Sequence, residues 1–310
     1  SCANGQRGAM LRSMLRPPYG EEIRRVPLIF PAPHWRLLAV AGLLLLATAP
    51  EARAQYTFTI IADSSSPTFS SFGQVPSVNA GGQVGFHANL DAGGTGLFTG
   101  NGTTTTTIAL SSSPTFASFG TDPSINAAGM LAFYAGLDGA AGSGVFTSDG
   151  TTTTTIAESS GPPYSFFNQS PTINTAGTVA FLAYLDEGGS GLYRSSGGAA
   201  TPIALSSMPV YSLFNDPTIN ASGTLGFWSG LEDGEQGIFT SDGTTTKTIA
   251  LTSGPIYSQL HSLPAMNASG TVGFRATLDS GGCGLFTGNG TTTTTIALTS
   301  GPVWSGFGDT

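Results

Sequence analysis

Apolar and polar residues alternate over short stretches of this chain, and the same stretch returns at a fixed interval. In residues 179–185 the set Val179, Phe181, Ala183 and Leu185 recurs at every second position, and a period of two is typical of a β-strand. An Asn-x-x-Gly phrase precedes each such stretch, and spacings of 47, 48, 46 and 47 residues define a repeat of about 47 residues. The asparagines are Asn79, Asn126, Asn174, Asn220 and Asn267.

Each repeat predicts four short strands joined by turns. The first is the apolar stretch before the asparagine. The second is the alternating stretch after it, such as residues 179–185. Asn-x-x-Gly predicts a turn between them, because Asn bonds its own backbone and Gly accepts a positive φ. The third strand contains an apolar pair such as Val145-Phe146, and the Asp149-Gly150 hairpin leads into the fourth, a threonine run that ends in Ile-Ala. A disordered threonine tract is the alternative interpretation of the last element.

One four-stranded antiparallel sheet per 40–50 residues is the period of a β-propeller blade. The longest connection of each repeat, such as residues 110–123, follows the outer strand, where a propeller chain must cross to the axis. We therefore predict an all-β fold and favour a β-propeller with five full blades and a partial one. A β-solenoid and a string of β-sandwich units are the alternatives, and a unit this small holds little core alone.

Residues 1–54 differ in composition from the repeats. Arg24, Arg25 and Arg36 precede an apolar run at residues 37–47, and residues 52–54 place alanines where a signal peptidase reads small residues. The run of 11 residues is shorter than the roughly 20 that a membrane-spanning helix needs, so a retained anchor is the weaker alternative. We interpret residues 1–54 as an upstream segment with a signal peptide, and residues 55–310 as one exported repeat domain, located outside the cell, on its surface or in the periplasm.

The order of strands within the repeat predicts an incomplete unit at the two ends of this domain. Residues 57–62 have the pattern of a fourth strand without three strands before it, and Thr310 stands just before the next first strand. We therefore expect a chain truncated at its C-terminus. Either the ring is open, or residues 57–62 lie at an unfinished sheet edge.

The charge of the repeat domain restricts its partners. Residues 55–310 contain three basic and fifteen acidic residues, which gives a net charge of −12. Such a surface repels phosphate backbones and anionic lipids. We expect no nucleic-acid partner and no membrane insertion of this part.

The complete phrase Asn-x-x-Gly-x-x-Ala-Phe occurs at residues 126–133 and 174–181. It resembles the repeat of bacterial exported tandem-repeat proteins of the NxxGxxAF (choice-of-anchor) family, and the similarity covers residues 61–310. Three repeats carry Gly85, Gly226 or Gly273 in place of Ala, which exchanges one small residue for another. The resemblance implies an exported protein, often anchored at the surface through a C-terminal signal, and no established biochemical activity.

Few residues are candidates for catalysis or metal binding. His87 and His261 are the histidines after residue 54, and neither lies in a recognised motif. Single acids before glycine-rich turns, such as Asp91, are typical of turn formation and supply fewer carboxylates than calcium usually needs. Cys283 is the one cysteine after residue 54, which excludes a two-cysteine metal site. We therefore predict no enzyme, no metal site and no cofactor.

The long connection of each repeat carries two aromatic positions. The second, Phe119 in the second repeat, hardly varies, and we interpret it as core packing. The first varies among Phe, Tyr and Trp, which is typical of rings with a polar tip at a binding surface, and such rings could stack on sugars. Packing between blades is the alternative. The candidate binding residues are Phe69, Phe116, Tyr164, Tyr211, Tyr257 and Trp304.

The sequence favours a non-catalytic secreted or surface-anchored repeat protein that acts as a scaffold or binds a glycan or protein ligand. A structural envelope or matrix component is one alternative, and a propeller enzyme with carboxylates from several blades is another. Exposed aromatic residues in the connections favour the first function, end-to-end stacking the second, and a convergent polar pocket at the axis the third.

Overall fold

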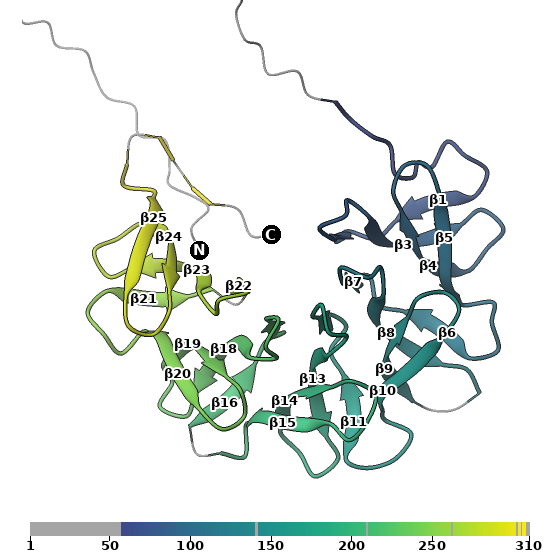
Figure 1. The fold of residues 1–310 in the computed structure, drawn as a ribbon. Helices are drawn as coiled ribbons and strands as arrows, with labels where there is room; N and C mark the ends of the chain where they lie inside the picture. Colours follow the sequence, from purple (N-terminus) through teal and green to yellow (C-terminus); the bar gives the residue numbers. More distant parts are fainter. Residues whose placement is uncertain are drawn as a thin grey trace, which may run out of the picture. The chain divides into compact units, whose positions relative to one another are not determined.

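The computed structural model describes residues 57–139, 142–208, 210–261, 263–301, 303–304 and 306–307. The signal peptide and the other interpretations of residues 1–54 lie outside the described residues. The strands form five antiparallel sheets, one per repeat, which we call blades 1 to 5 of a β-propeller (Figure 1). All five blades belong to one compact unit. No helix in the described ranges is long and apolar enough to cross a membrane.

The strands of the blades occupy equivalent places. Blade 1 contains β1 (Phe69–Phe72), β2 (Ser77–Val78), β3 (Val84–Leu90), β4 (Thr95–Gly100) and β5 (Thr105–Leu110). Blade 2 contains β6 (Phe116–Phe119), β7 (Ser124–Ile125), β8 (Leu131–Leu137), β9 (Ser143–Ser148) and β10 (Thr153–Glu158). Blade 3 contains β11 (Tyr164–Phe167), β12 (Thr172–Ile173), β13 (Val179–Leu185), β14 (Ser190–Ser195) and β15 (Thr201–Leu205). Blade 4 contains β16 (Tyr211–Phe214), β17 (Thr218–Ile219), β18 (Leu225–Leu231), β19 (Gln236–Ser241) and β20 (Thr246–Leu251). Blade 5 contains β21 (Tyr257–Leu260), β22 (Ala265–Met266), β23 (Val272–Leu278), β24 (Cys283–Gly288) and β25 (Thr293–Leu298).

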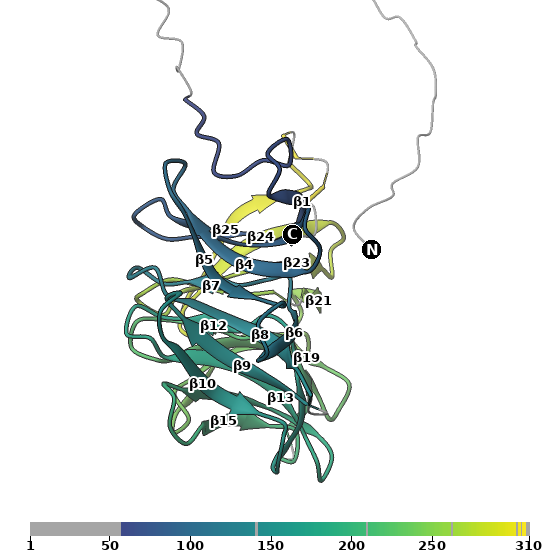
Figure 2. The ribbon, with the colours of Figure 1, turned by 90° about the vertical axis from the view of Figure 1, so that its right-hand side faces the viewer.

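Each sheet has four strands hydrogen-bonded in a row and a fifth, short strand. The short strand and the first strand of the blade pair with the same neighbouring strand. In blade 2 the order is β10-β9-β8-β6, and β7 pairs with the free part of the same edge of β8 (Figure 2). The sequence predicted β7 but assigned β6 to a connection. Its register with β8 shifts between Phe116 and Ser118, so the side chains of β6 do not follow a period of two. That irregularity hid the strand from the pattern.

The Asn-x-x-Gly turns have the predicted local structure. Asn174 Oδ1 accepts hydrogen bonds from the backbone N–H groups of Ala176 (3.0 Å) and Thr178 (2.9 Å). Gly177 has a φ of 85°, which glycine adopts without strain. The five turns converge on one pocket of about 310 Å³ at the centre of the ring. These turns therefore mark the axis of the propeller.

The hydrophobic core lies between successive blades. Leu97 and Ile108 of blade 1 pack with Phe119 and Phe133 of blade 2 in one buried cluster. Equivalent clusters join blades 2 and 3, 3 and 4, and 4 and 5. Each blade thus has one face for the preceding blade and another for the following blade.

The phenylalanine that follows each turn is buried in every blade, with at most 6% of its surface exposed. This confirms the predicted register of the second strand. The residues are Phe86, Phe133, Phe181, Phe227 and Phe274.

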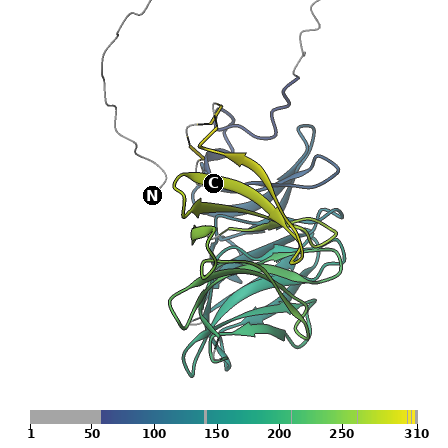
Figure 3. The same ribbon diagram turned by 90° about the vertical axis from the view of Figure 1, so that its left-hand side faces the viewer.

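The chain enters blade 1 without a preceding sheet. Residues 57–62 form no strand in the described part of the chain, and β1 is its first strand. Ile61 and Ala62 nevertheless pack against the cluster of Phe69, Phe86 and Phe98 in blade 1. At the other end β25 closes blade 5, shown in yellow in Figure 3.

A candidate ligand-binding groove between blades 4 and 5

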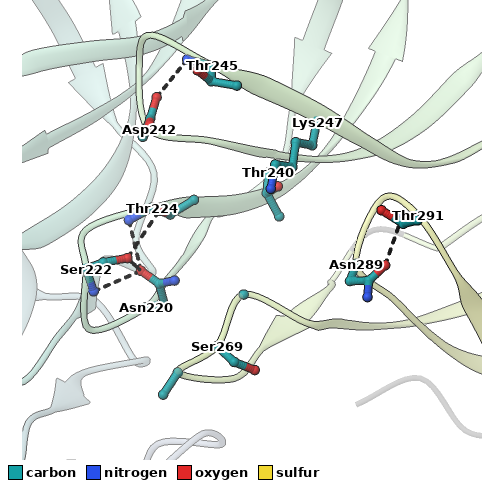
Figure 4. Close-up of a pocket in the computed structure, with 12 residues that line it drawn as sticks. Asn220, Ser222, Thr224, Thr240, Asp242, Thr245, Lys247, Ser269, Asn289 and Thr291 are labelled. Carbon is teal, nitrogen blue, oxygen red and sulfur yellow. Dashed lines mark hydrogen bonds between the residues drawn. The ribbon is translucent and has the colours of Figure 1, made fainter.

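A polar groove opens between blades 4 and 5, on the side of the Asn-x-x-Gly turns. Its volume is about 630 Å³, and both blades contribute their turn and their outer hairpin (Figure 4). Thr224, Thr240 and Lys247 line it from blade 4, and Ser269 and Asn289 line it from blade 5. Every residue of the lining is polar or small.

Strand pairing and turn geometry place these side chains. Thr240 on β19 stands directly opposite Lys247 on β20, so both reach the same wall of the groove. Thr224 follows Asn220, whose Oδ1 accepts a hydrogen bond of 2.9 Å from the Thr224 backbone N–H. On the far wall Asn289 Oδ1 accepts from the Thr291 backbone N–H at 2.9 Å. The turns are thus fixed by their own hydrogen bonds before any ligand binds.

Long side chains occupy the equivalent space between the other blades. Between blades 1 and 2, Gln83 Nε2 donates to Thr99 Oγ1 (3.1 Å), and Gln83 Oε1 lies 2.6 Å from where a Cβ on Gly129 would stand. Between blades 2 and 3, Met130 packs against the buried cluster that joins these two blades. Between blades 3 and 4, Arg194 donates to the carbonyl of Gly223, and the pocket there is about 250 Å³.

Blade 4 carries threonines at both of the positions from which other blades fill this space. Thr224 aligns with Gln83 and Met130, and Thr240 aligns with Arg194. Near Gly270 of blade 5, the closest side-chain atom to a Cβ built there is Asn220 Nδ2, at 3.8 Å. The groove between blades 4 and 5 is open because Thr224 and Thr240 are too short to fill it.

The groove contains one carboxylate and one ammonium group. Hydrogen bonds from the backbone N–H of Thr245 and from Thr244 lower the pKa of Asp242 to about 2, so this carboxylate is ionised at neutral pH. Lys247 is exposed and forms no ion pair among the described residues. The other four repeats have threonine at its position: Thr106, Thr154, Thr201 and Thr294.

This arrangement suits hydrogen bonding better than bond cleavage. Hydroxyl, amide, ammonium and carboxylate groups surround a space large enough for a small polar molecule. Its lining contains no histidine, cysteine or aromatic ring. A ligand would therefore be recognised through its own hydroxyl groups and charges, without ring stacking or an activated nucleophile.

The aromatic residues proposed from the sequence lie elsewhere. Four of the six rings are buried in the clusters within and between blades, Tyr164 is half-buried, and Trp304 is 53% exposed. The Phe116 ring meets Phe133 and Phe146 edge-on, at centroid distances of 5.8 and 5.1 Å. Burial, with a smaller contribution from Tyr193, raises the pKa of Tyr164 to about 12. Five of these rings therefore pack within the sheets and clusters, and Trp304 is exposed.

A second pocket, of about 510 Å³, lies on the axis and combines apolar and acidic residues. Val75 and Leu263 line it together with Asp122 and Asp216. Asn168 Nδ2 donates to both oxygens of Asp216, at 2.7 and 2.8 Å, which ties blade 3 to blade 4. Burial raises the pKa of Asp216, with a smaller contribution from Asp122. No group of three or more histidine, cysteine or acidic side chains within the described ranges could hold a metal ion.

The residues of the polar groove were not among the sequence candidates. One signal was available, because Lys247 is the one charged residue in the stretches that correspond to the threonine runs. At the aligned positions some repeats have a long side chain (Gln83, Met130 or Arg194) and others have threonine. This difference predicts an open groove only when it is known which blades face each other. Sequence spacing alone could not supply that pairing.

Comparison with known proteins identifies a family and a set of similar folds. Residues 65–206 and 159–309 match the profile of a family of unknown function (DUF7453). No curated protein matches the chain. A point mutant of the Aleuria aurantia lectin in complex with α-methyl-L-fucoside is 12% identical over 76% of this chain and 78% of its own, with a TM-score of 0.41. The SapL1 lectin in complex with α-methyl fucoside is 9% identical over 74% and 81%, with a TM-score of 0.41. The β-propeller domain of the Trilobed protease from Pyrococcus furiosus, with its open velcro topology, is 11% identical over 81% and 100%, with a TM-score of 0.29.

Proposed function

The chain belongs to DUF7453, a family of unknown function, and we propose that it is a non-catalytic binding protein for a hydroxyl-rich saccharide. The ligand lies in the groove between blades 4 and 5. Side chains of Thr224, Thr240 and Lys247 contact it from one wall, and Ser269 and Asn289 contact it from the other.

One observation carries this proposal: long side chains fill the equivalent space between the other blades, and this groove is open. Its volume of about 630 Å³ falls within the roughly 300–1,000 Å³ typical of small-molecule sites. A saccharide presents many hydroxyl groups at short spacing, and these groups need donors and acceptors in return. The threonine and serine hydroxyls, the Asn289 amide and the Asp242–Lys247 charges supply both kinds.

The same proposal includes export of the protein and its location outside the cytoplasm. The arginines and apolar run of residues 1–54, and the resemblance to exported NxxGxxAF-repeat (choice-of-anchor) proteins, support a secreted or surface-anchored scaffold. The low content of basic residues in the repeats supports a partner other than nucleic acid or anionic lipid.

A glycan-binding assay with the full chain tests the proposal. The labelled protein is applied to immobilised neutral, amino and acidic saccharides, and dissociation constants are measured for those retained. Thr240→Arg places in this groove the side chain that already fills the groove between blades 3 and 4. We expect it to weaken binding at least about tenfold, equivalent to about 1.4 kcal/mol.

Arg194→Thr is the matched control, because it removes the plug from the neighbouring groove and leaves blades 4 and 5 unchanged. We expect this variant to bind the selected saccharide as the parent protein does. Retention of no saccharide, or equal binding by the parent protein and Thr240→Arg, would refute the assignment and favour a purely structural role.

A further inference from the structure

Two sheet faces of this propeller lack the neighbour that every equivalent face has. In the interior of the ring, the isoleucine of each outer strand packs against the following blade. Ile108, Ile156, Ile203 and Ile249 are 5–7% exposed, whereas Ile296 of blade 5 is 61% exposed. Leu285 is half-buried, although its equivalents Leu97, Val145, Leu192 and Ile238 are fully buried. The face of blade 5 that should meet a following blade is therefore uncovered.

The face of blade 1 that should meet a preceding blade is uncovered as well. Phe72 is 37% exposed, while its equivalents in the other blades are 2–9% exposed. Val78 is exposed, whereas Ile125 and Ile173 at the same place are buried. Figure 1 shows both faces, on the blue and the yellow blade, at the open side of the ring.

Part of the missing neighbour is already present on blade 1. Ile61 Cγ2 lies 3.0 Å from where a Cβ on Gly100 would stand. Ile249 Cγ2 lies 2.8 Å from the same point on Gly288, the equivalent residue of blade 5. Ile61 thus lies against blade 1 at the position where Ile249, from the outer strand of blade 4, lies against blade 5.

Two residues near the end of the described chain correspond to the first strand of a blade. Trp304 and Phe307 align with Phe116 and Phe119 of blade 2, and their rings lie 6.2 Å apart. Trp304 is exposed, although the aligned Phe116 is buried. The strands without any counterpart are those equivalent to β7, β8 and β9.

We propose that the uncovered faces of blades 1 and 5 form a socket for one more unit of this repeat, continuous with Trp304 and Phe307. Three strands with the chemistry of β7, β8 and β9 complete it, and residues 57–62 pair as its fourth strand. A phenylalanine pair like Phe133 and Phe146 covers Ile296, and the opposite face of the unit covers Phe72. The contacts repeat those of the four interfaces already present, which the two uncovered faces continue.

The turn of the added unit also extends the hydrogen bonds around the axis. Asn79, Asn126 and Asn174 each donate an Nδ2 hydrogen bond to the carbonyl of the next turn asparagine, at 3.1, 3.4 and 3.1 Å. A sixth turn asparagine would donate in the same way to the carbonyl of Asn79. A turn of this kind would therefore add a hydrogen bond to the apolar contacts of the socket.

Appending a copy of residues 123–148 after Thr310 tests the proposal in the full chain. Hydrogen exchange of residues 57–62 and tryptophan fluorescence are compared with those of the parent protein. We expect exchange of these amides to slow at least about tenfold, because they enter a sheet. The emission of Trp304 should shift to shorter wavelength as the ring becomes buried.

The control is the same extension with the copies of Phe133 and Phe146 changed to serine. It has the same length but lacks the apolar face, and neither signal should change. Unaltered exchange and emission with the intact extension would overturn the proposal. So would a parent protein that sediments as a dimer with residues 57–62 already protected, since a second copy would then cover these faces.

Discussion

The asparagines of the first three Asn-x-x-Gly turns each have two structural functions, which need different atoms of the side chain. Oδ1 accepts two backbone N–H groups of its own turn, and Nδ2 links that turn to the next blade. Only the first function follows from local sequence, because the partner of Nδ2 lies 46 to 48 residues away. A carboxylate could accept the turn bonds but could not donate the inter-blade bond.

Alanine substitutions at Asn174 and Asn267 separate these two functions. Both remove turn hydrogen bonds, and Asn174→Ala also removes the 3.1 Å bond to the Asn220 carbonyl. We expect Asn174→Ala to lower the free energy of unfolding by about 1 kcal/mol more than Asn267→Ala. Urea unfolding monitored by circular dichroism measures both values. Equal losses would show that the inter-blade bond contributes no stability.

His87 gives the fold a pH dependence of known sign. The side chain is buried, its Nδ1 has no hydrogen-bond partner among the residues that the structure describes, and burial lowers its pKa. The unfolded chain then binds a proton at a higher pH than the folded chain does. Stability from the neutral ring is present above the ordinary pKa of about 6.5 and decreases as the pH falls toward the folded-state pKa.

His87→Leu places at this position the residue that blade 3 has there, Leu182. The parent protein should lose stability as the pH falls below about 6.5, and we expect this variant to lose less over the same interval. Thermal unfolding of both proteins at a series of pH values provides the comparison. Parallel curves across that interval would mean that His87 does not titrate differently on folding.

The strands that follow the glycine turns could be predicted from the sequence, and the aromatic strand within the long connection could not. β8, β9 and β10 correspond to predicted strands, and the glycine turns fix where they begin. β6 went unrecognised because its aromatic residues, Phe116 and Phe119, are three positions apart across a register shift. The aromatic series was ambiguous for a related reason, since tyrosine serves both cores and binding surfaces. Burial, which distinguishes the two uses, depends on the neighbouring blade.

The outer strands of blades 4 and 5 provide a matched pair for the inter-blade core. Ile249 is buried against blade 5, and Ile296 occupies the same place on the uncovered face of blade 5. Ile249→Ala should lower the free energy of unfolding by about 2–4 kcal/mol, and Ile296→Ala by less than about 0.5 kcal/mol. Chemical denaturation of the two variants checks both values. A large loss at Ile296 would indicate that a partner covers this face in solution.

From blade 1 to blade 5 the interfaces are alike in their apolar core and differ at their polar rim. The core contacts recur from blade to blade, whereas the rim carries Gln83, Met130 and Arg194 at three interfaces and short threonines at the fourth. A repeat architecture can therefore keep its fold while one interface has an open polar groove. The repeated strands and turns could be recognised from the sequence. The structure was needed to recognise that a difference in side chains at the rim leaves one groove open.

An NMR titration tests the proposed saccharide site most directly. Backbone amide signals of the full chain are recorded while the saccharide retained in the binding assay is added. We predict saturable shifts confined to the groove between blades 4 and 5, at Thr240, Lys247, Ser269 and Asn289. The shifts should disappear in Thr240→Arg and persist in Arg194→Thr. Shifts centred on another interface or on Trp304, or none at saturating saccharide, would contradict the account.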